Sequence, residues 1–305
     1  LHDSHYAHAG CLIANGDIVA HFAFRTTVGQ SMLRALFLLR VSRPILWPVL
    51  PLVYLLGLNA AGASVTPIAV LQMLLLTLPM NLVGCGLNDI YDFESDRRSG
   101  RRRKVWGAVV RAEDRPLVWR GVIVMAPLIM IGALATRNAW NIAATCGMLT
   151  GAWAYSVPPV RLKERPPLDS LANGLGYFLL PFVMGYSLGA DPAAMPLKYY
   201  LLALCVCGIH ALATAADYEA DREANHRTLA VAFGRRAATL VALASFGVAL
   251  WFGDFHGLAV RLFLLVGLVA TLAATLWPRE RVIAAACVAV FVGFLIAAIC
   301  HVAGV

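Results

Sequence analysis

Acidic residues occur in two short segments of the chain that share one pattern: Asp, aromatic, Glu, small residue, Asp, Arg. The first reads Asp92-Phe93-Glu94-Ser95-Asp96-Arg97, and the second, 125 residues further on, reads Asp217-Tyr218-Glu219-Ala220-Asp221-Arg222. Residues four positions apart share a helix face. Each segment therefore presents two carboxylates on one stripe, and Asn88 extends the first stripe, with Asp89 beside it.

The repeated pattern predicts that the two segments face each other around one site. Their carboxylates would repel one another there and need a cationic partner. Oxygen ligands favour a hard ion such as Mg²⁺, which binds through a few carboxylates together with the phosphates of a substrate. The alternative is that these acids only cap helices and pair with nearby arginines. Two matching segments beside dense basic loops favour binding, whereas Glu94 and Glu219 lie off the stripes and are predicted to form structural salt bridges.

Basic residues follow these acidic segments or stand alone near the ends of apolar runs. Arg161 and Lys163 come directly after Tyr155-Ser156-Val157-Pro158-Pro159, Arg43 precedes the first long apolar run, and Lys104 ends an arginine-rich loop. An Arg guanidinium grips phosphate oxygens in a fork, and Lys supplies a point charge. Most of the arginine-rich loop is interpreted as a topology signal that contacts lipid headgroups.

The composition shows which elements must position these groups. Hydrophobic residues make up 60% of the 305 residues, charged residues make up 14%, and the mean hydropathy is +0.73. A soluble domain carries about 25% charged residues. The chain is therefore predicted to be an all-α integral membrane protein, and the net charge of +8, which is gathered in loops between apolar runs, does not indicate nucleic-acid binding.

A transmembrane helix needs about 20 apolar residues. Nine runs of that size predict nine transmembrane helices, at 44–62, 67–88, 117–136, 139–157, 169–189, 198–217, 236–253, 258–277 and 282–302. They divide the chain into a polar N-terminal tail (1–21), an amphipathic interfacial segment (22–43) and a nine-helix domain (44–305). In this layout the N-terminal segment and every loop that follows an even-numbered span lie on one side of the membrane, and that side holds 22 of the 25 Lys and Arg residues. Because cytoplasmic loops are enriched in Lys and Arg, the acidic segments, which lie on the same side, are predicted to face the cytoplasm.

The acidic motifs resemble those of a known family. Asn88-Asp89-x-x-Asp92-x-x-x-Asp96 resembles the first signature of the UbiA superfamily of intramembrane prenyltransferases, and Asp217-x-x-x-Asp221 resembles its second. The Tyr155 to Lys163 stretch and the nine spans are also similar, so the resemblance covers roughly residues 35 to 303. It implies nine helices around a central lipid-embedded cavity, where an isoprenyl diphosphate loses its diphosphate and an acceptor captures the allylic cation.

The resemblance also implies roles for individual residues. The predicted Mg²⁺ or diphosphate ligands are Asn88, Asp92, Asp96, Asp217 and Asp221, with Asp89 in support. The predicted diphosphate contacts are Arg43, Lys104, Arg161 and Lys163, and Tyr155 is predicted either to stabilise the cation with its aromatic face or to pack. Many members carry an extra Asp where this chain has Thr214, which leaves the number of metal ions open.

The acceptor is read from weaker similarities. The lycopene elongase branch is similar at Pro167-Leu168-Asp169-Ser170, Asn173-Gly174, Tyr177, Pro181 and Gly185-Tyr186, which predicts a lipophilic acceptor such as the carotenoid lycopene. The donor would be geranylgeranyl, farnesyl or dimethylallyl diphosphate. Three alternatives stay open: an aromatic (quinone or chlorin) prenyltransferase, a UbiA-type terpene cyclase and, from a different class, a membrane transporter. The transporter is disfavoured because both acidic segments map to helix ends rather than to the bilayer centre.

Overall fold

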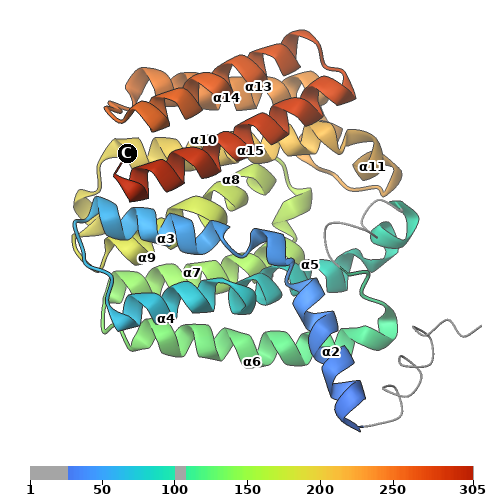
Figure 1. Ribbon diagram of the computed structural model, residues 1–305. Helices are drawn as coiled ribbons and strands as arrows, with labels where there is room; N and C mark the ends of the chain where they lie inside the picture. The colour runs from blue at the N-terminus through green and yellow to red at the C-terminus, as the bar shows by residue number, and fades with distance from the viewer. Residues whose placement is uncertain (1–26, 100–107, 305) are drawn as a thin grey trace, which may run out of the picture.

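The computed structural model describes residues 27–99 and 108–304, and describes side chains for 29–92 and 108–304. Within these ranges every regular element is a helix (Figure 1). The predicted tail at 1–21 and Lys104 lie outside the described residues, and so does the side chain of Asp96.

The first half of the described chain contains helices on both sides of the first acidic segment. They are α2 (Thr27–Val41), η1 (Pro44–Leu46), α3 (Val49–Ala60), α4 (Pro67–Leu76), α5 (Leu78–Ser99), η3 (Ala112–Asp114), α6 (Arg115–Leu134) and α7 (Ala139–Ser156).

The second half begins with a short turn, η4 (Leu162–Glu164), and a continuous helical segment, 168–186, in which α8 (Leu168–Gly174) passes through a π-helical turn, η5 (Leu175–Leu179), into α9 (Leu180–Tyr186). The elements that follow are η6 (Pro192–Ala194), α10 (Leu197–Ala216), α11 (Tyr218–Glu223), α12 (Leu229–Phe233), α13 (Arg235–Phe252), α14 (Leu258–Leu276) and α15 (Glu280–Ala303).

Helices lie at each of the predicted apolar runs. Among the described residues, six stretches are long and apolar enough to cross a membrane: Pro67–Asp92, Ala112–Leu134, Leu197–Ala216, Arg235–Phe252, Leu258–Leu276 and Glu280–Ala303. A seventh is present if Gly29–Val41 and Pro44–Ala60, which are bent by 49° at their junction, form one span. The all-helical, multi-pass architecture is thus confirmed, while the count of nine spans and the interfacial role of 22–43 stay predictions.

The run predicted at 67–88 as one span is interrupted at Thr77, between α4 and α5. Pro79 lies in the first turn of α5 and lacks the N–H that would continue the ladder of hydrogen bonds. The amide of Asn81 donates to the carbonyls of Leu76 (3.2 Å) and Thr77 (2.8 Å). Because lipid offers no hydrogen bonds, such substitution by a side chain is what makes the break tolerable.

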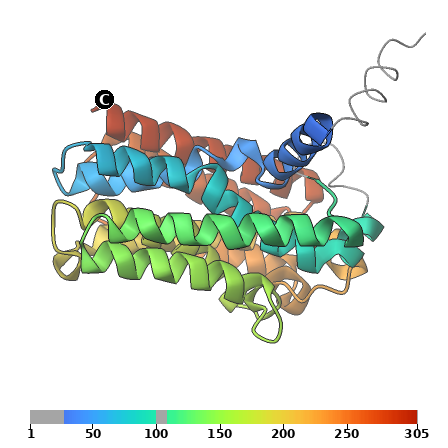
Figure 2. The ribbon, with the colours of Figure 1, turned by 90° about the horizontal axis from the view of Figure 1, so that it is seen from below.

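The helices run side by side and pack as two groups with a layer between them (Figures 1 and 2). One buried core joins α3 to α4, α5, α6 and α7, and a second joins α10 to α13, α14 and α15. Helix α3 and the 168–186 segment contribute to both cores. These two elements therefore hold the two groups together.

Close contact between α3 and α9 depends on two glycines. A Cβ at Gly57 would lie 2.0 Å from the carbonyl oxygen of Phe182, and one at Gly185 would lie 2.0 Å from the carbonyl oxygen of Tyr54. Small residues of this kind allow membrane helices to approach until their backbones touch. The contact fixes the 168–186 segment relative to α3.

A buried polar network ties two further helices to this pair. The Tyr54 hydroxyl donates to Gln72 (2.8 Å), and the Gln72 amide donates to Asn141 (2.6 Å). The Asn141 amide in turn donates to the carbonyl of Met184 (2.8 Å). The network links α3, α4, α7 and α9, and hydrogen bonds between membrane helices each contribute about 0.6 to 2 kcal/mol.

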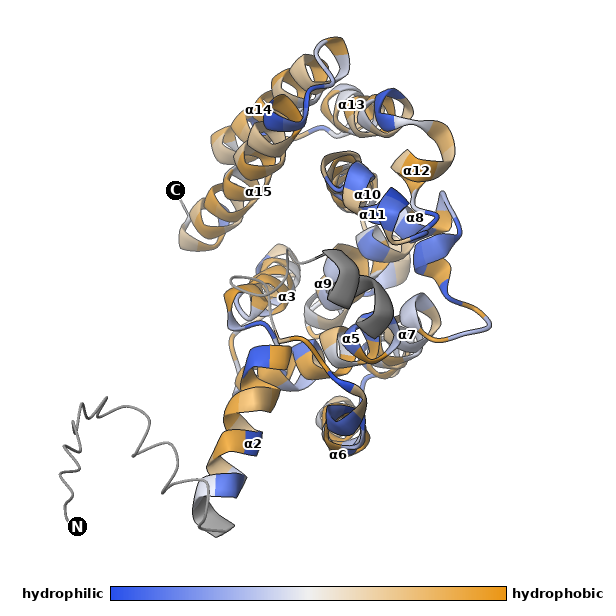
Figure 3. Ribbon diagram, turned by 90° about the vertical axis from the view of Figure 1, so that its right-hand side faces the viewer, coloured by the Kyte–Doolittle hydropathy of each residue, from blue (hydrophilic) through white to orange (hydrophobic). Residues whose placement is uncertain are grey.

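The polar connections gather at one end of the bundle. The carboxyl end of α5 and helix α11 lie at the right in Figure 1, opposite the C-terminus. Seen from that end, hydrophilic residues surround α5, α8, α10 and α11 (Figure 3). The fold therefore brings the two acidic segments to the same end of the bundle.

Candidate functional site

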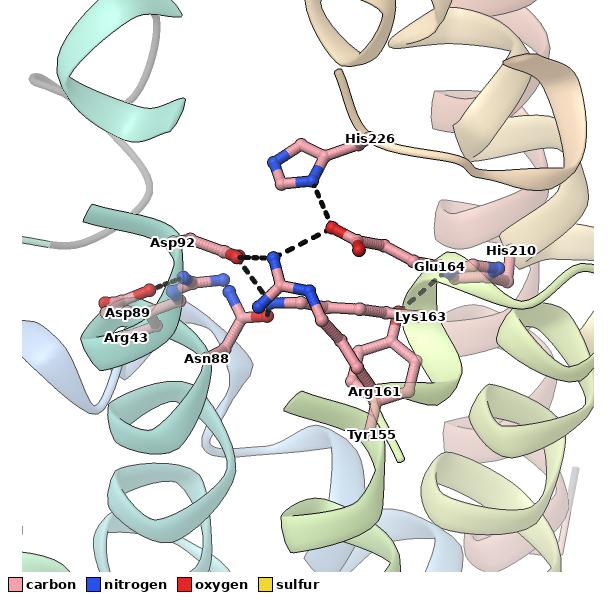
Figure 4. A network of polar contacts seen from close by, with 10 residues as sticks. All are labelled: Arg43, Asn88, Asp89, Asp92, Tyr155, Arg161, Lys163, Glu164, His210 and His226. Carbon is pink, nitrogen blue, oxygen red and sulfur yellow. Dashed lines mark hydrogen bonds and ion pairs between the residues drawn. The ribbon is translucent and has the colours of Figure 1, made fainter. Parts of the chain in front are cut away.

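Lys163 joins two polar residues of α5, Asn88 and Asp92. Its ammonium lies 2.9 Å from Asn88 Oδ1 and 2.5 Å from Asp92 Oδ1 (Figure 4). Asn88 and Asp92 are one helical turn apart, so both oxygens face the same way. Lys163 and Asp92 are both buried, with 7% and 5% of their surface exposed. The two oxygens thus converge on one cationic point.

A second buried ion pair lies beside the first. Arg43 donates to Asp89 Oδ1 at 2.5 Å, which joins the α2–η1 connection to α5. Arg43 adopts a left-handed backbone with φ 51°, and Arg161 does so with φ 40°. Non-glycine residues pay of order 1 kcal/mol or more for this conformation. Two predicted site arginines are therefore held in strained turns by the packing around them.

Arg161 connects the first acidic segment to the second. Its guanidinium lies 3.3 Å from Asp92 Oδ1 and 2.8 Å from Glu164 Oε1. Glu164 accepts from His226 Nδ1 at 2.8 Å, and the backbone N–H of His226 donates to the carbonyl of Asp221 at 2.8 Å. A continuous chain of polar contacts thus runs from α5 through η4 to His226 (Figure 4), and the backbone of His226 extends it to Asp221 of α11.

This chain of contacts makes one part of the stability depend on pH. The hydrogen bond from His226 and the contact with Arg161 lower the pKa of Glu164 from 4.5 to about 2, although partial burial raises it. A lowered folded-state pKa adds stability above pH 4.5 that is lost as the pH falls toward 2. We expect Glu164→Gln to lower the free energy of unfolding by about 1 to 2 kcal/mol at pH 7, since water screens a partly exposed pair.

Thermal melts in detergent at pH 7, 5 and 3 measure this contribution. The gap in melting temperature between wild type and Glu164→Gln should narrow as the pH falls from 5 to 3. Glu113→Gln is the matched control, because Glu113 is 70% exposed. A gap that stays constant with pH would contradict the ionic role of Glu164.

The second acidic segment spans the junction of α10 and α11. Asp217 lies between the two helices and is exposed, and Asp221 accepts from the Thr228 hydroxyl at 3.1 Å. The backbone N–H of Asp221 donates to the carbonyl of Asp217 at 2.9 Å, so the i to i+4 relation survives the junction. Glu219 pairs with Arg222 and Arg235, as the sequence predicts.

The predicted ligand set is brought together only in part. Asn88, Asp92, Arg161 and Lys163 are in direct contact, with Arg43 and Asp89 alongside. In the described part of the chain, no three Asp, Glu, His or Cys side chains form a group that could hold a metal ion. The five-residue Mg²⁺ set therefore stays a prediction, and the side chain of one member, Asp96, lies outside the described residues.

An apolar cavity of about 370 Å³ lies directly beneath these contacts. Arg43, Asn88 and Tyr155 line its polar end. The remaining lining comes mainly from small and apolar residues of α5, α7 and the 168–186 segment, among them Gly84, Gly151, Met148, Gly176 and Leu180. Arg43 Nε is buried and has no hydrogen-bond partner among the described residues, so this guanidinium can still donate to a ligand.

A polar cluster lies beside this cavity, and the sequence interpretation missed one of its members, His210. Tyr155 lies 3.2 Å from His210 Nε2, and Ser170 Oγ lies 3.1 Å from His210 Nδ1. Asn173 donates to the Tyr155 hydroxyl at 3.1 Å. His210 lies within the predicted 198–217 run, and an ionisable residue within a membrane span is itself a signal of function.

These features together define a class of protein. A multi-pass helical bundle places buried cations and carboxylates over an apolar cavity, an arrangement suited to a lipid-soluble substrate with an anionic head.

Comparison with known proteins identifies the family. Residues 45–294 match the model of the UbiA prenyltransferase family. The lycopene elongase/hydratase of Haloarcula japonica is 33% identical over 211 residues, which cover 65% of this chain and 67% of that protein. The enzyme of the same name from Haloferax volcanii is 32% identical over 219 residues, 67% of each chain.

A solved structure has the same fold. A UbiA homolog from Archaeoglobus fulgidus bound to DMAPP and Mg²⁺ superposes with a TM-score of 0.62 at 22% identity, covering 84% of this chain and 98% of that one. This chain belongs to the UbiA prenyltransferase family and is an integral membrane enzyme that transfers prenyl groups.

Proposed function

We propose that this enzyme transfers an isoprenyl group from a prenyl diphosphate to a carotenoid such as lycopene, with Mg²⁺ as cofactor and with its polar end facing the cytoplasm. The observation that carries the proposal is the junction of Arg43, Asn88 and Tyr155 with an apolar cavity. The polar end of the cavity suits an anionic diphosphate, and its apolar walls suit a hydrocarbon chain. The names of the carotenoid-modifying relatives support the acceptor.

Each group at the polar end has a distinct task in this reaction. Arg43, Arg161 and Lys163 bind the diphosphate oxygens, and Lys104 is proposed to join them. Their positive charge stabilises the diphosphate as its bond to the allylic carbon breaks. The aromatic ring of Tyr155, at the cavity wall, faces the allylic cation. The apolar walls exclude water, so the acceptor rather than water captures the cation.

The residues present suit a Mg²⁺ ion. Asn88 Oδ1 and Asp92 Oδ1 already converge on one cation, the Lys163 ammonium. Mg²⁺ needs only one or two carboxylates when substrate phosphates supply further ligands. We assign the protein ligands to Asn88, Asp92 and Asp96 of the first segment and to Asp217 and Asp221 of the second. When bound, the ion would neutralise the diphosphate charge and make this group a better leaving group.

The lining of the cavity favours a hydrocarbon acceptor over an aromatic acid. Arg43 is the one charged residue among the described residues that line it, and Asp89 holds that guanidinium. Binding an aromatic carboxylate would require a further cation deep in the cavity. The polyene of a carotenoid needs none, because apolar contact alone retains it.

The direct test uses the purified enzyme in lipid nanodiscs with geranylgeranyl diphosphate, lycopene and Mg²⁺. We expect prenylated lycopene by mass spectrometry together with released diphosphate, and we expect EDTA to abolish both. Diphosphate release without an acceptor would indicate a cyclase. Activity that EDTA leaves unchanged, or prenylation of 4-hydroxybenzoate in place of lycopene, would overturn the proposal.

Three glycines in the cavity wall offer a test of where the prenyl chain lies. A Cβ at Gly84, Gly151 or Gly176 would meet no atom within 4 Å. Gly151→Leu therefore narrows the cavity without disturbing the backbone. We expect the ratio of kcat/KM for geranylgeranyl over dimethylallyl diphosphate to fall by about tenfold or more, because steric exclusion of even one methylene costs about 1 to 3 kcal/mol.

The matched control for this substitution is Gly247→Leu on α13. A Cβ there would approach only Leu268, at 3.8 Å, and the residue lies away from the cavity. The control should keep the ratio of the wild type. Equal ratios for Gly151→Leu and the control would place the prenyl chain elsewhere.

A further inference from the structure

Four polar side chains form a cluster within the helix bundle, against the cavity wall. Tyr155 and Asn173 line the cavity, while His210 and Ser170 stand behind them. They come from α7, α8 and α10. Figure 4 shows the contact between Tyr155 and His210. Polar groups in lipid surroundings are costly unless they are paired, so this cluster calls for an explanation.

The hydrogen bonds determine where each proton lies. Asn173 Nδ2 donates to the backbone carbonyl of Asp169 at 2.9 Å, which identifies it as the amide nitrogen. The same nitrogen contacts the Tyr155 hydroxyl oxygen at 3.1 Å, so that oxygen accepts there. The single Tyr155 proton is then left for His210 Nε2, 3.2 Å away.

His210 is thereby fixed in one neutral tautomer. Its Nε2 accepts from Tyr155, so its proton lies on Nδ1 and is donated to Ser170 Oγ at 3.1 Å. The unprotonated nitrogen, Nε2, is hydrogen-bonded to the Tyr155 hydroxyl, and Tyr155 lines the cavity. The cluster is therefore arranged to carry a proton from the cavity to the imidazole.

The proposed reaction releases one proton in that cavity. When an allylic cation adds to a C=C bond, the acceptor is left with a positive charge on carbon. The charge disappears when a neighbouring C–H bond breaks and its electron pair forms a new C=C bond. Alternatively, water adds and loses one O–H proton. Both routes need a proton acceptor in surroundings that hold little water.

We propose that His210 accepts this proton through Tyr155, a role that rests on the proposed transfer to an alkene acceptor. The phenol oxygen takes the proton from the acceptor as its own O–H proton moves to His210 Nε2. His210 becomes an imidazolium whose Nδ1–H still donates to Ser170. It returns to the neutral form by passing the proton to water when the products leave.

The carboxylates near the cavity already serve other partners. Asp169 accepts from the backbone N–H groups of Ser170 and Leu229, both at 2.8 Å, and so anchors α12 to α8. Asp92 and Asp89 are held by Lys163 and Arg43. Of the described side chains around the cavity, the imidazole of His210 is the one neutral base aligned with a cavity-facing hydroxyl.

The test compares diphosphate release with carotenoid prenylation in the same reaction. We expect His210→Gln to release diphosphate within about threefold of wild type, because bond breaking precedes proton loss. Prenylated product per diphosphate should fall by about a hundredfold, the lower bound for loss of a general base, with prenyl alcohol formed in its place. Tyr155→Phe keeps the aromatic ring that faces the cation and removes only the phenol O–H, so prenylated product per diphosphate should fall in the same way, and this variant tests the relay if His210→Gln fails to fold.

The matched control is His256→Gln, because His256 is 81% exposed in the connection between α13 and α14. It should keep the coupling of wild type. Loss of diphosphate release and product in parallel would mean that His210 is structural, and unchanged coupling in both variants would overturn the relay. If wild type itself makes no prenylated carotenoid, the proposed function fails instead.

Discussion

Replacing Asp92 with Asn is expected to lower diphosphate release by about a hundredfold to a thousandfold, the cost of losing one preorganised electrostatic partner in an active site. Asp92 is buried and accepts from both Lys163 (2.5 Å) and Arg161 (3.3 Å). Asn keeps the shape and one oxygen but removes the charge. Both cations then lose one charged partner, and the predicted metal site loses a ligand.

The choice of Asn over Ala separates chemistry from folding. Removing one partner of a buried ion pair costs about 3 to 5 kcal/mol when it leaves a charge without compensation. In Asp92→Asn, Lys163 keeps Asn88, and Arg161 keeps Glu164. We therefore expect the variant to fold, with its melting temperature lowered by a few degrees.

The matched control is Asp254→Asn at the opposite end of the bundle. Asp254 is 86% exposed and pairs only with His256 among the described residues. Diphosphate release should match wild type there. If Asp92→Asn also retains full release, the contacts around Asp92 hold the fold and take no part in the reaction.

Asp217→Asn tests the second acidic segment on its own. Asp217 is exposed at the end of α10, so the fold should tolerate its loss. A fall in release comparable to that of Asp92→Asn is expected if both segments serve one site. A normal rate in Asp217→Asn, beside an inactive Asp92→Asn, would confine the site to α5 and η4.

The sequence predicts the positions of the helices well, and for a simple reason. The apolar runs at 198–217 and 258–277 correspond to α10 (Leu197–Ala216) and α14 (Leu258–Leu276). Charged or helix-breaking residues lie at both ends of these runs. Within lipid, the backbone N–H and C=O groups must hydrogen-bond to one another, which a helix achieves. The break at Thr77 was not predictable, because it depends on Asn81 reaching back to two carbonyls.

The site was predictable only as far as local spacing carries. The i to i+4 relation places Asn88 and Asp92 on one face, and the structure shows both contacting one ammonium. That ammonium belongs to Lys163, which lies 71 residues after Asp92 in the chain. The contact depends on how the chain folds back, and no pattern within one helix predicts it. His210 stands alone in an apolar run, so only its partners on α7 and α8 reveal its setting.

Lys163→Met is expected to change metal affinity and turnover in opposite directions. The Lys163 ammonium occupies the point on which Asn88 and Asp92 converge. Two unit charges about 4 Å apart interact by about 4 kcal/mol near a protein surface. If Lys163→Met removes only a third of this repulsion, about 1.4 kcal/mol, the dissociation constant of the divalent ion falls by about tenfold.

Turnover should nevertheless fall, by about a hundredfold. A neutral Met contributes no charge to the departing diphosphate, and the lost electrostatic stabilisation appears in the rate. The fold should survive, because Asp92 keeps Arg161 and Met fills much of the volume of the Lys stem.

Titration of Mn²⁺ into the substrate-free enzyme, followed by electron paramagnetic resonance, measures the affinity without reference to activity. Lys198→Met is the matched control, since Lys198 lies over the Tyr199 ring at the far end of the bundle. It should leave both quantities unchanged. If Lys163→Met binds Mn²⁺ more weakly than wild type, the ammonium organises the acidic residues rather than standing in for the ion. The contacts of Lys163 with Asn88 and Asp92 would then serve to hold η4 against α5, and the metal site would lie nearer Asp217.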